Sequence, residues 1–168
     1  AAGQALAVFG SAVVSTIGLA TAHAVFVFMG TAAEVSIAGT GYLWVILSGM
    51  PAYFVFTWVS AAFRATGDAQ TPLRLLAVAA VVNLIIDPVL IFGLGFFPAL
   101  GVVGAAVATV VAWLVSAAWG WVLLRRMGLR PLVRELIRPP RRETWDALKV
   151  GLPLALEGAF FSVIYIFL

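Results

Sequence analysis

The chain has 168 residues, of which 64 % are hydrophobic and 10 % are charged, with a formal net charge of +3 and a mean hydropathy of +1.13. Soluble domains carry about a quarter charged residues, so this composition excludes an ordinary water-soluble fold, and its apolarity excludes disorder. With no cysteine and a single histidine, His23, we expect no metal cluster, no cofactor and no nucleophilic enzyme site. An all-α integral membrane protein remains.

Long apolar segments predict the membrane spans. Four runs cover residues 5–29, 37–63, 73–95 and 101–124, and a fifth begins at 151 and is still apolar at 168. A helix of ~20 residues crosses ~30 Å of hydrocarbon, and none of the runs alternates as a membrane strand would. We therefore expect a polytopic helix bundle of four complete spans plus a truncated fifth. The first run lacks the features of a secretory signal, which favours a chain that is part of a longer protein.

The positive charges predict the orientation of the bundle. All ten Lys and Arg residues fall in the loops 64–74 and 125–150, and positive charge collects on the cytoplasmic side of a membrane. We expect both loops to be cytoplasmic, in an inner or plasma membrane. This bias explains the basic net charge, so lipids are expected partners and nucleic acid is not. Segment 125–150 has apolar residues at helical spacing, which predicts a basic amphipathic connector on the inner leaflet; it either joins two halves of a larger bundle or is an ordinary surface helix.

The acidic residue Asp87 is the strongest functional signal, because an ionisable side chain inside a span is costly. It lies 13 residues past Arg74 and 8 before Gly95, about 20 Å and about 12 Å along a helix. Asn83 precedes it by four residues and shares its helical face. Pro88 follows it and favours a helix bend, because proline cannot donate a backbone hydrogen bond.

The next span offers Thr109 at a similar depth. It lies eight residues after Gly101, and rows of small residues such as Gly104, Ala108 and Ala112 let neighbouring helices approach closely. Asn83, Asp87 and Thr109 are therefore expected to supply an amide, a carboxylate and a hydroxyl to one pocket. Such a pocket can exchange a proton or hold a hard monovalent cation such as Na⁺, and the residues leave this choice open. The alternative is a polar contact that only fixes packing.

Glu157 is a weaker candidate site than Asp87, and the loop before residue 73 is a structural feature. Glu157 lies eight residues after Lys149, about 12 Å into the fifth span, and is a possible second acidic site or a water-accessible carboxylate. The loop before residue 73 is expected to be a tight turn in which Thr71 caps the third span and Pro72 takes its first helical position.

Three motifs resemble the multidrug and toxic compound extrusion (MATE) family, in the family's order. They are the loop FRATGDAQTP at 63–72, the segment NLIIDP at 83–88 and the helix start GVVGAAVAT at 101–109. In the loop, Thr66 stands where a glycine is usual. The resemblance implies a twelve-helix, two-lobe transporter of which this chain spans the third to seventh helices. Residues 1–124 would belong to the N-terminal lobe, 125–150 to the link, and 151–168 to the start of the C-terminal lobe.

The same resemblance implies a function. The family exports cationic or amphipathic drugs in exchange for H⁺ or Na⁺, and its N-lobe cation site matches Asn83, Asp87 and Thr109, while Glu157 corresponds weakly to an acid on the seventh helix. A further acidic residue on the family's first helix has no counterpart here. The resemblance implies as partners a small organic cation and the remaining helices. The alternatives are a lipid-linked saccharide flippase of the same superfamily and a non-transporting structural subunit of a membrane complex.

Overall fold

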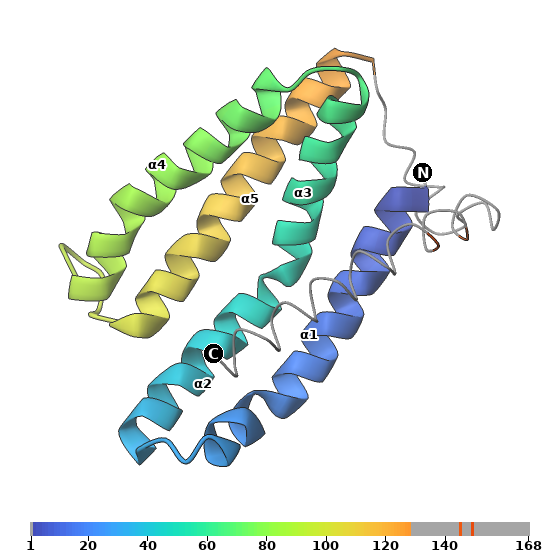
Figure 1. The fold of residues 1–168 in the computed structure, drawn as a ribbon. Coiled ribbons are helices and arrows are strands. Elements are labelled where there is room, and N and C mark those ends of the chain that lie inside the picture. Colours follow the sequence, from blue (N-terminus) through green and yellow to red (C-terminus); the bar gives the residue numbers. More distant parts are fainter. Residues whose placement is uncertain (1, 129–144, 146–148, 150–168) are drawn as a thin grey trace, which may run out of the picture. The chain divides into compact units, whose positions relative to one another are not determined.

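The computed structural model describes residues 2–128, 145 and 149 (Figure 1). Regular structure in this part of the chain is entirely helical: α1 (Ala2–Phe28), α2 (Ala33–Ser48), α3 (Met50–Ala65), α4 (Gln70–Phe92) and α5 (Val102–Arg126). The chain forms two compact units, residues 7–130 and residues 1–6 with 131–168. In the second unit, the Lys149 ammonium lies 5.8 Å from the Trp145 ring. The rest of the predicted connector 125–150 beyond residue 128, and all of 151–168, lie outside the described residues.

Three of the described helices are long and apolar enough to cross a membrane: α1 from Gly10 to Phe28, α4 and α5. They correspond to the expected spans 5–29, 73–95 and 101–124, with ends that differ by a few residues. The expected span 37–63 is not continuous. It consists of α2 and α3, whose axes are bent by 46° at a short break, and the pair makes a fourth crossing if it is counted as one span.

The break has a local cause in the residues that join the two helices. Gly49 ends α2 and begins α3, and Pro51 has no N–H to donate to the Leu47 carbonyl four residues earlier. The glycine is required for space rather than for its backbone angle, since its φ is −81°. A Cβ at position 49 would overlap Val110 Cγ2 of α5. The apolar composition that predicted a single span is therefore compatible with two helices packed against α5.

A row of small residues brings α5 close to its neighbours. The expected face of Gly104, Ala108 and Ala112 is buried and continues at the same spacing through Ser116 and Gly120. A Cβ on Gly104 would lie 2.6 Å from the Leu90 carbonyl oxygen of α4, and one on Gly120 would lie 2.6 Å from a methyl of Val59 on α3. In lipid the hydrophobic effect provides no driving force between helices, and close van der Waals packing at small residues takes its place.

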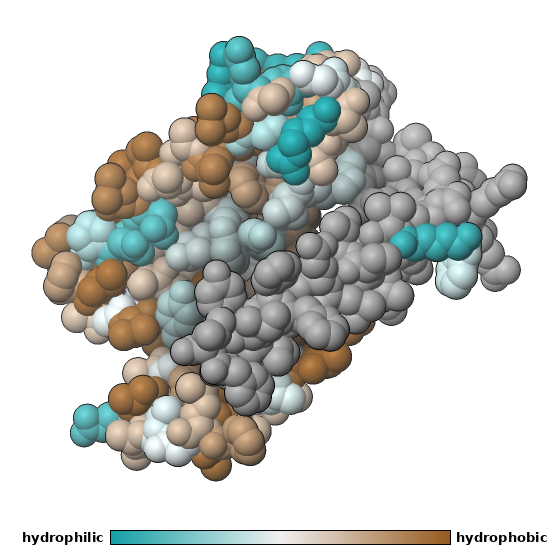
Figure 2. Space-filling model, viewed as in Figure 1, coloured by the Kyte–Doolittle hydropathy of each residue, from teal (hydrophilic) through white to brown (hydrophobic). Residues whose placement is uncertain are grey.

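The described basic residues of the bundle gather at one end. Arg64 lies in the last turn of α3, Arg74 near the start of α4, and Arg125 and Arg126 in the last turn of α5. Figure 1 shows that the α3–α4 turn and the end of α5 lie together, and Figure 2 shows hydrophilic surface over this end. The Arg125 guanidinium lies 5.9 Å from the Trp121 ring, within cation–π range. This arrangement agrees with one basic side of the membrane.

Asp68 organises the turn between α3 and α4. Its carboxylate accepts hydrogen bonds from the backbone N–H groups of Gln70 and Thr71, both at 2.9 Å, and from the Thr71 hydroxyl at 2.5 Å. The expectation that Thr71 caps the helix is thus wrong: Asp68 is the acceptor and Thr71 a donor, and Pro72 is the third residue of α4. The Thr71 hydroxyl, followed by the backbone bonds and the Arg74 charge, holds the pKa of Asp68 below its ordinary value of 3.8.

This turn predicts a pH-dependent stability. A carboxylate whose pKa is lowered by folding stabilises the protein above its unfolded-state pKa, and this contribution disappears as the pH falls through the lowered folded-state value. We expect D68N to lower the unfolding temperature in detergent at neutral pH. The difference from the wild type should vanish well below pH 3.8, where both side chains are neutral. A difference that persists at the lowest pH would contradict this account.

Candidate cation site at the interface of α4 and α5

The loop at residues 93–101 makes α4 and α5 neighbours. Gly93 ends α4 in the left-handed conformation with φ of +70°, and a Cβ there would lie 2.5 Å from the Ala99 backbone nitrogen. The Leu100 and Gly101 N–H groups donate to the last turn of α4, to the carbonyls of Leu90 and Ile91. The chain therefore folds back tightly, as expected of a short outer loop between the third and fourth spans.

Asn83 and Asp87 lie on the face of α4 that meets α5. Leu75 and Ala79 are buried on this face, and Asn83 and Asp87 continue the row at the same spacing of four and are half-buried. In Figure 2 a hydrophilic patch interrupts the hydrophobic surface partway along α4, and these two are the only strongly polar residues of the helix after Arg74.

Hydrogen bonds join the three predicted site residues across the two helices. Asn83 Nδ2 lies 3.2 Å from Thr109 Oγ1, and the Thr109 hydroxyl can donate to the Ala105 carbonyl at 2.9 Å. With the amide turned over, Nδ2 donates to Asp87 Oδ2 at 3.0 Å, and the amide oxygen accepts from the Thr109 backbone N–H and from Thr109 Oγ1, both at 3.2 Å. This second orientation satisfies both ends of the amide, whereas the first sets its oxygen against the carboxylate and its nitrogen against the Thr109 N–H. The structure thus brings the amide, the carboxylate and the hydroxyl together. Asn83 is the central member in either orientation.

One carboxylate oxygen of this cluster has no partner. Asp87 Oδ1 is buried and accepts no hydrogen bond. Leaving a charged acceptor buried and unsatisfied is costly, and a proton or a bound cation relieves this cost. Asp87 therefore has one oxygen free to bind an ion beside one that contacts the Asn83 amide.

Pro88 lies inside α4, which continues as a helix to Phe92. The proline removes the N–H that would otherwise donate to the Leu84 carbonyl. The helix therefore lacks one backbone hydrogen bond next to Asp87. The bend expected at Pro88 stays a prediction.

The structure adds neither of the remaining candidates to this cluster. His23 is exposed on α1, and Glu157 lies outside the described residues. Among the residues that the structure describes, no group of three or more His, Asp or Glu side chains is placed to hold a metal ion.

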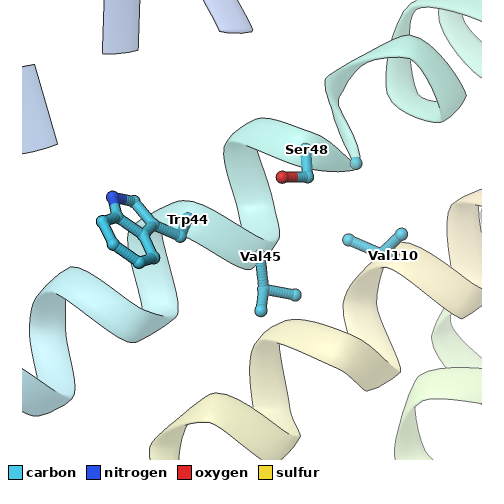
Figure 3. Close-up of a pocket in the computed structure, with 5 residues that line it drawn as sticks. Trp44, Val45, Ser48 and Val110 are labelled. Atoms are coloured by element: carbon cyan, nitrogen blue, oxygen red, sulfur yellow. The ribbon is translucent and has the colours of Figure 1, made fainter. Parts of the chain in front are cut away.

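An open cavity of about 340 Å³ lies beside the break between α2 and α3, lined by Trp44, Val45, Ser48, Gly49 and Val110. Figure 3 shows Val45 of α2 and Val110 of α5 extending into the space between the two helices. The lining is mostly apolar, and Ser48 adds a hydroxyl. This cavity was not predicted from the sequence, although the Gly49–Pro51 pair inside a long apolar run indicates a break in the helix.

Comparisons with known proteins agree on one family. The MatE family model matches residues 1–89. A probable multidrug resistance protein NorM of Thermotoga maritima is 31 % identical over 94 % of this chain and 34 % of its own length. The probable multidrug resistance protein YoeA of Bacillus subtilis is 30 % identical over 80 % of this chain and 30 % of its own length.

A protein named FAD transporter, from Shewanella oneidensis, is 49 % identical over 36 % of this chain and 14 % of its own length. No solved structure matches. The chain spans about a third of the length of the curated relatives that it matches over most of its sequence.

The cluster predicts an order of stability among substitutions. T109V removes one partner of the Asn83 amide and should cost about 0.6 kcal/mol, the average for a hydrogen bond between membrane helices. N83L should cost more, because it leaves both Thr109 and the Asp87 carboxylate without the amide. Unfolding in detergent measures both. T57V is the matched control, since the Thr57 hydroxyl donates within α3; a T109V no more costly than T57V would contradict the bridging role of Asn83.

Proposed function

The chain belongs to the MatE family of multidrug and toxic compound extrusion proteins, and on this premise we propose that it is part of a secondary antiporter that exports cationic or amphipathic drugs in exchange for H⁺ or Na⁺. The membrane-capable helices and the family make it an integral membrane protein. In such transporters a site near the membrane midplane is exposed to each side in turn as two bundles rock about it.

The observation that carries the proposal is the buried, unpartnered Oδ1 of Asp87 beside the Asn83 amide. A carboxylate that only tied α4 to α5 would have both of its oxygens satisfied. We assign the coupling ion to this position. H⁺ would bind the carboxylate directly, and Na⁺ would take oxygen ligands from Asp87, from the Asn83 amide and from Thr109.

The Asn83 amide suggests how occupancy of Asp87 is passed to α5. When Asp87 is ionised, Nδ2 donates to its carboxylate, and the amide oxygen accepts from the backbone N–H and the hydroxyl of Thr109. A proton or Na⁺ on Asp87 would weaken the first of these hydrogen bonds, because it neutralises the charge that Nδ2 contacts. Loading the carboxylate would therefore loosen the link that Asn83 makes between α4 and α5.

A cationic substrate fits the charges better than an anionic one. The segments 1–63 and 75–124 contain no Lys or Arg, whereas pyrophosphate groups, as in FAD or a lipid-linked saccharide, are usually held by basic side chains. Two relatives are named as multidrug resistance proteins. A cationic drug would leave as Asp87 is neutralised by the coupling ion, because the two positive charges compete for one carboxylate.

We expect D87N to abolish drug export while leaving the amount of membrane-inserted protein unchanged, because the amide keeps the shape of the side chain but binds neither a proton nor Na⁺. Export by the full protein is measured in drug-sensitive cells and in proteoliposomes with an imposed H⁺ or Na⁺ gradient, which also identifies the ion. E34Q is the matched control, since Glu34 is exposed in the first turn of α2. Wild-type export by D87N would refute the proposal.

A further inference from the structure

The break between α2 and α3 leaves a backbone acceptor inside an apolar segment. In a continuous helix the N–H of residue 51 would donate to the Leu47 carbonyl, but residue 51 is proline. Hydrocarbon contains no water to replace the missing donor, and an unsatisfied carbonyl there costs several kcal/mol. A break of this kind persists in a membrane only if another group supplies the hydrogen bond.

One donor to the Leu47 carbonyl is the Gly49 N–H, which is shared with the Val45 carbonyl, and Ser15 of α1 supplies a second, undivided one. The Ser15 hydroxyl donates to the Leu47 carbonyl at 2.6 Å. It is one of a row of residues, Ser11, Ser15, Gly18 and Ala22, that are buried or half-buried along one side of α1. A Cβ on Gly18 would lie 2.6 Å from Leu47 Cδ2, so α1 approaches Leu47 closely enough for a side chain as short as serine to reach its carbonyl.

We propose that residues 48–51 form a hinge and that Ser15 is the positioning residue that holds this hinge in its bent state. The bond replaces the donor that Pro51 lacks and adds to the N–H that Gly49 shares between Leu47 and Val45, so it stabilises the bent segment and links α1 to it. Gly49 gives the hinge its room, because it carries no side chain against Val110 of α5. This inference goes beyond the proposed transport function and does not depend on it.

The cavity beside the break depends on the same bend. Four of its five lining residues, Trp44, Val45, Ser48 and Gly49, belong to the last turns of α2 or to the hinge, and the fifth is Val110 of α5 (Figure 3). Straightening the segment would move these residues relative to Val110 and change the volume between α2 and α5. Through its bond to Leu47, Ser15 of α1 therefore affects the volume of this cavity, although it is not one of the lining residues.

A double-mutant cycle tests the proposal in the full protein. S15A should lower the unfolding temperature by a few degrees in the wild-type background. It should lower it much less in a P51A background, where the substituted residue provides the backbone N–H that makes Ser15 dispensable. An equal loss in both backgrounds would overturn the proposal by showing that Ser15 acts through packing alone, and so would the absence of any loss in the wild type. T16V is the control: the Thr16 hydroxyl donates within α1, to Ala12.

A second measurement does not need P51A to fold. The 168-residue sequence contains no cysteine, so spin labels can be placed at I37C on α2 and A61C on α3, both exposed positions, with any cysteine elsewhere in the full protein replaced. S15A should shift or broaden the distance between the labels, whereas T16V should leave it as in the wild type. An unchanged distance in S15A would overturn the role of Ser15 in holding the bend, whatever the variants do to transport.

Discussion

Inside hydrocarbon every polar group must find its partner within the protein, and the two interfaces described above follow from this constraint. Asn83 links Asp87 of α4 to Thr109 of α5, and Ser15 of α1 serves the Leu47 carbonyl of α2. In water either contact would be worth little, because solvent would satisfy the same atoms. In lipid they contribute to the contacts between neighbouring helices. Among the buried side-chain atoms left without a partner in the described part of the chain, Asp87 Oδ1 is the one that belongs to a carboxylate, and it is where we propose that the coupling ion binds.

Close helix packing makes this chemistry geometrically possible. Gly104 lets the backbone of α5 approach Leu90 of α4, one turn beyond Asp87, and Thr109 lies five residues further along α5. Bulkier residues at Gly104 would move the two axes apart and carry the Thr109 hydroxyl out of reach of the amide. The row of small residues thus sets the distances of the site, although it contributes none of the site's polar atoms.

Much of this architecture was predictable because it depends on composition and short-range spacing. Asn83 and Asp87 share a face through their separation of four, and the hairpin loop brings Thr109 opposite them. The break at Gly49 was missed because hydropathy measures how apolar a segment is and does not register a missing backbone donor. The role of Ser15 was beyond sequence reasoning for another reason: it depends on which carbonyl of a neighbouring helix lies next to it, and that is settled only by tertiary packing.

The contact between Gly49 and Val110 carries a consequence for how this protein can vary. The backbone of Gly49, with φ of −81°, is one that any amino acid adopts, so only the valine methyls exclude a larger residue. The side chains at positions 49 and 110 compete for the same space. Alanine at position 49 becomes tolerable once residue 110 is smaller than valine, and we expect neither substitution to be neutral alone. Natural or engineered variants of this hinge should therefore come in compensated pairs.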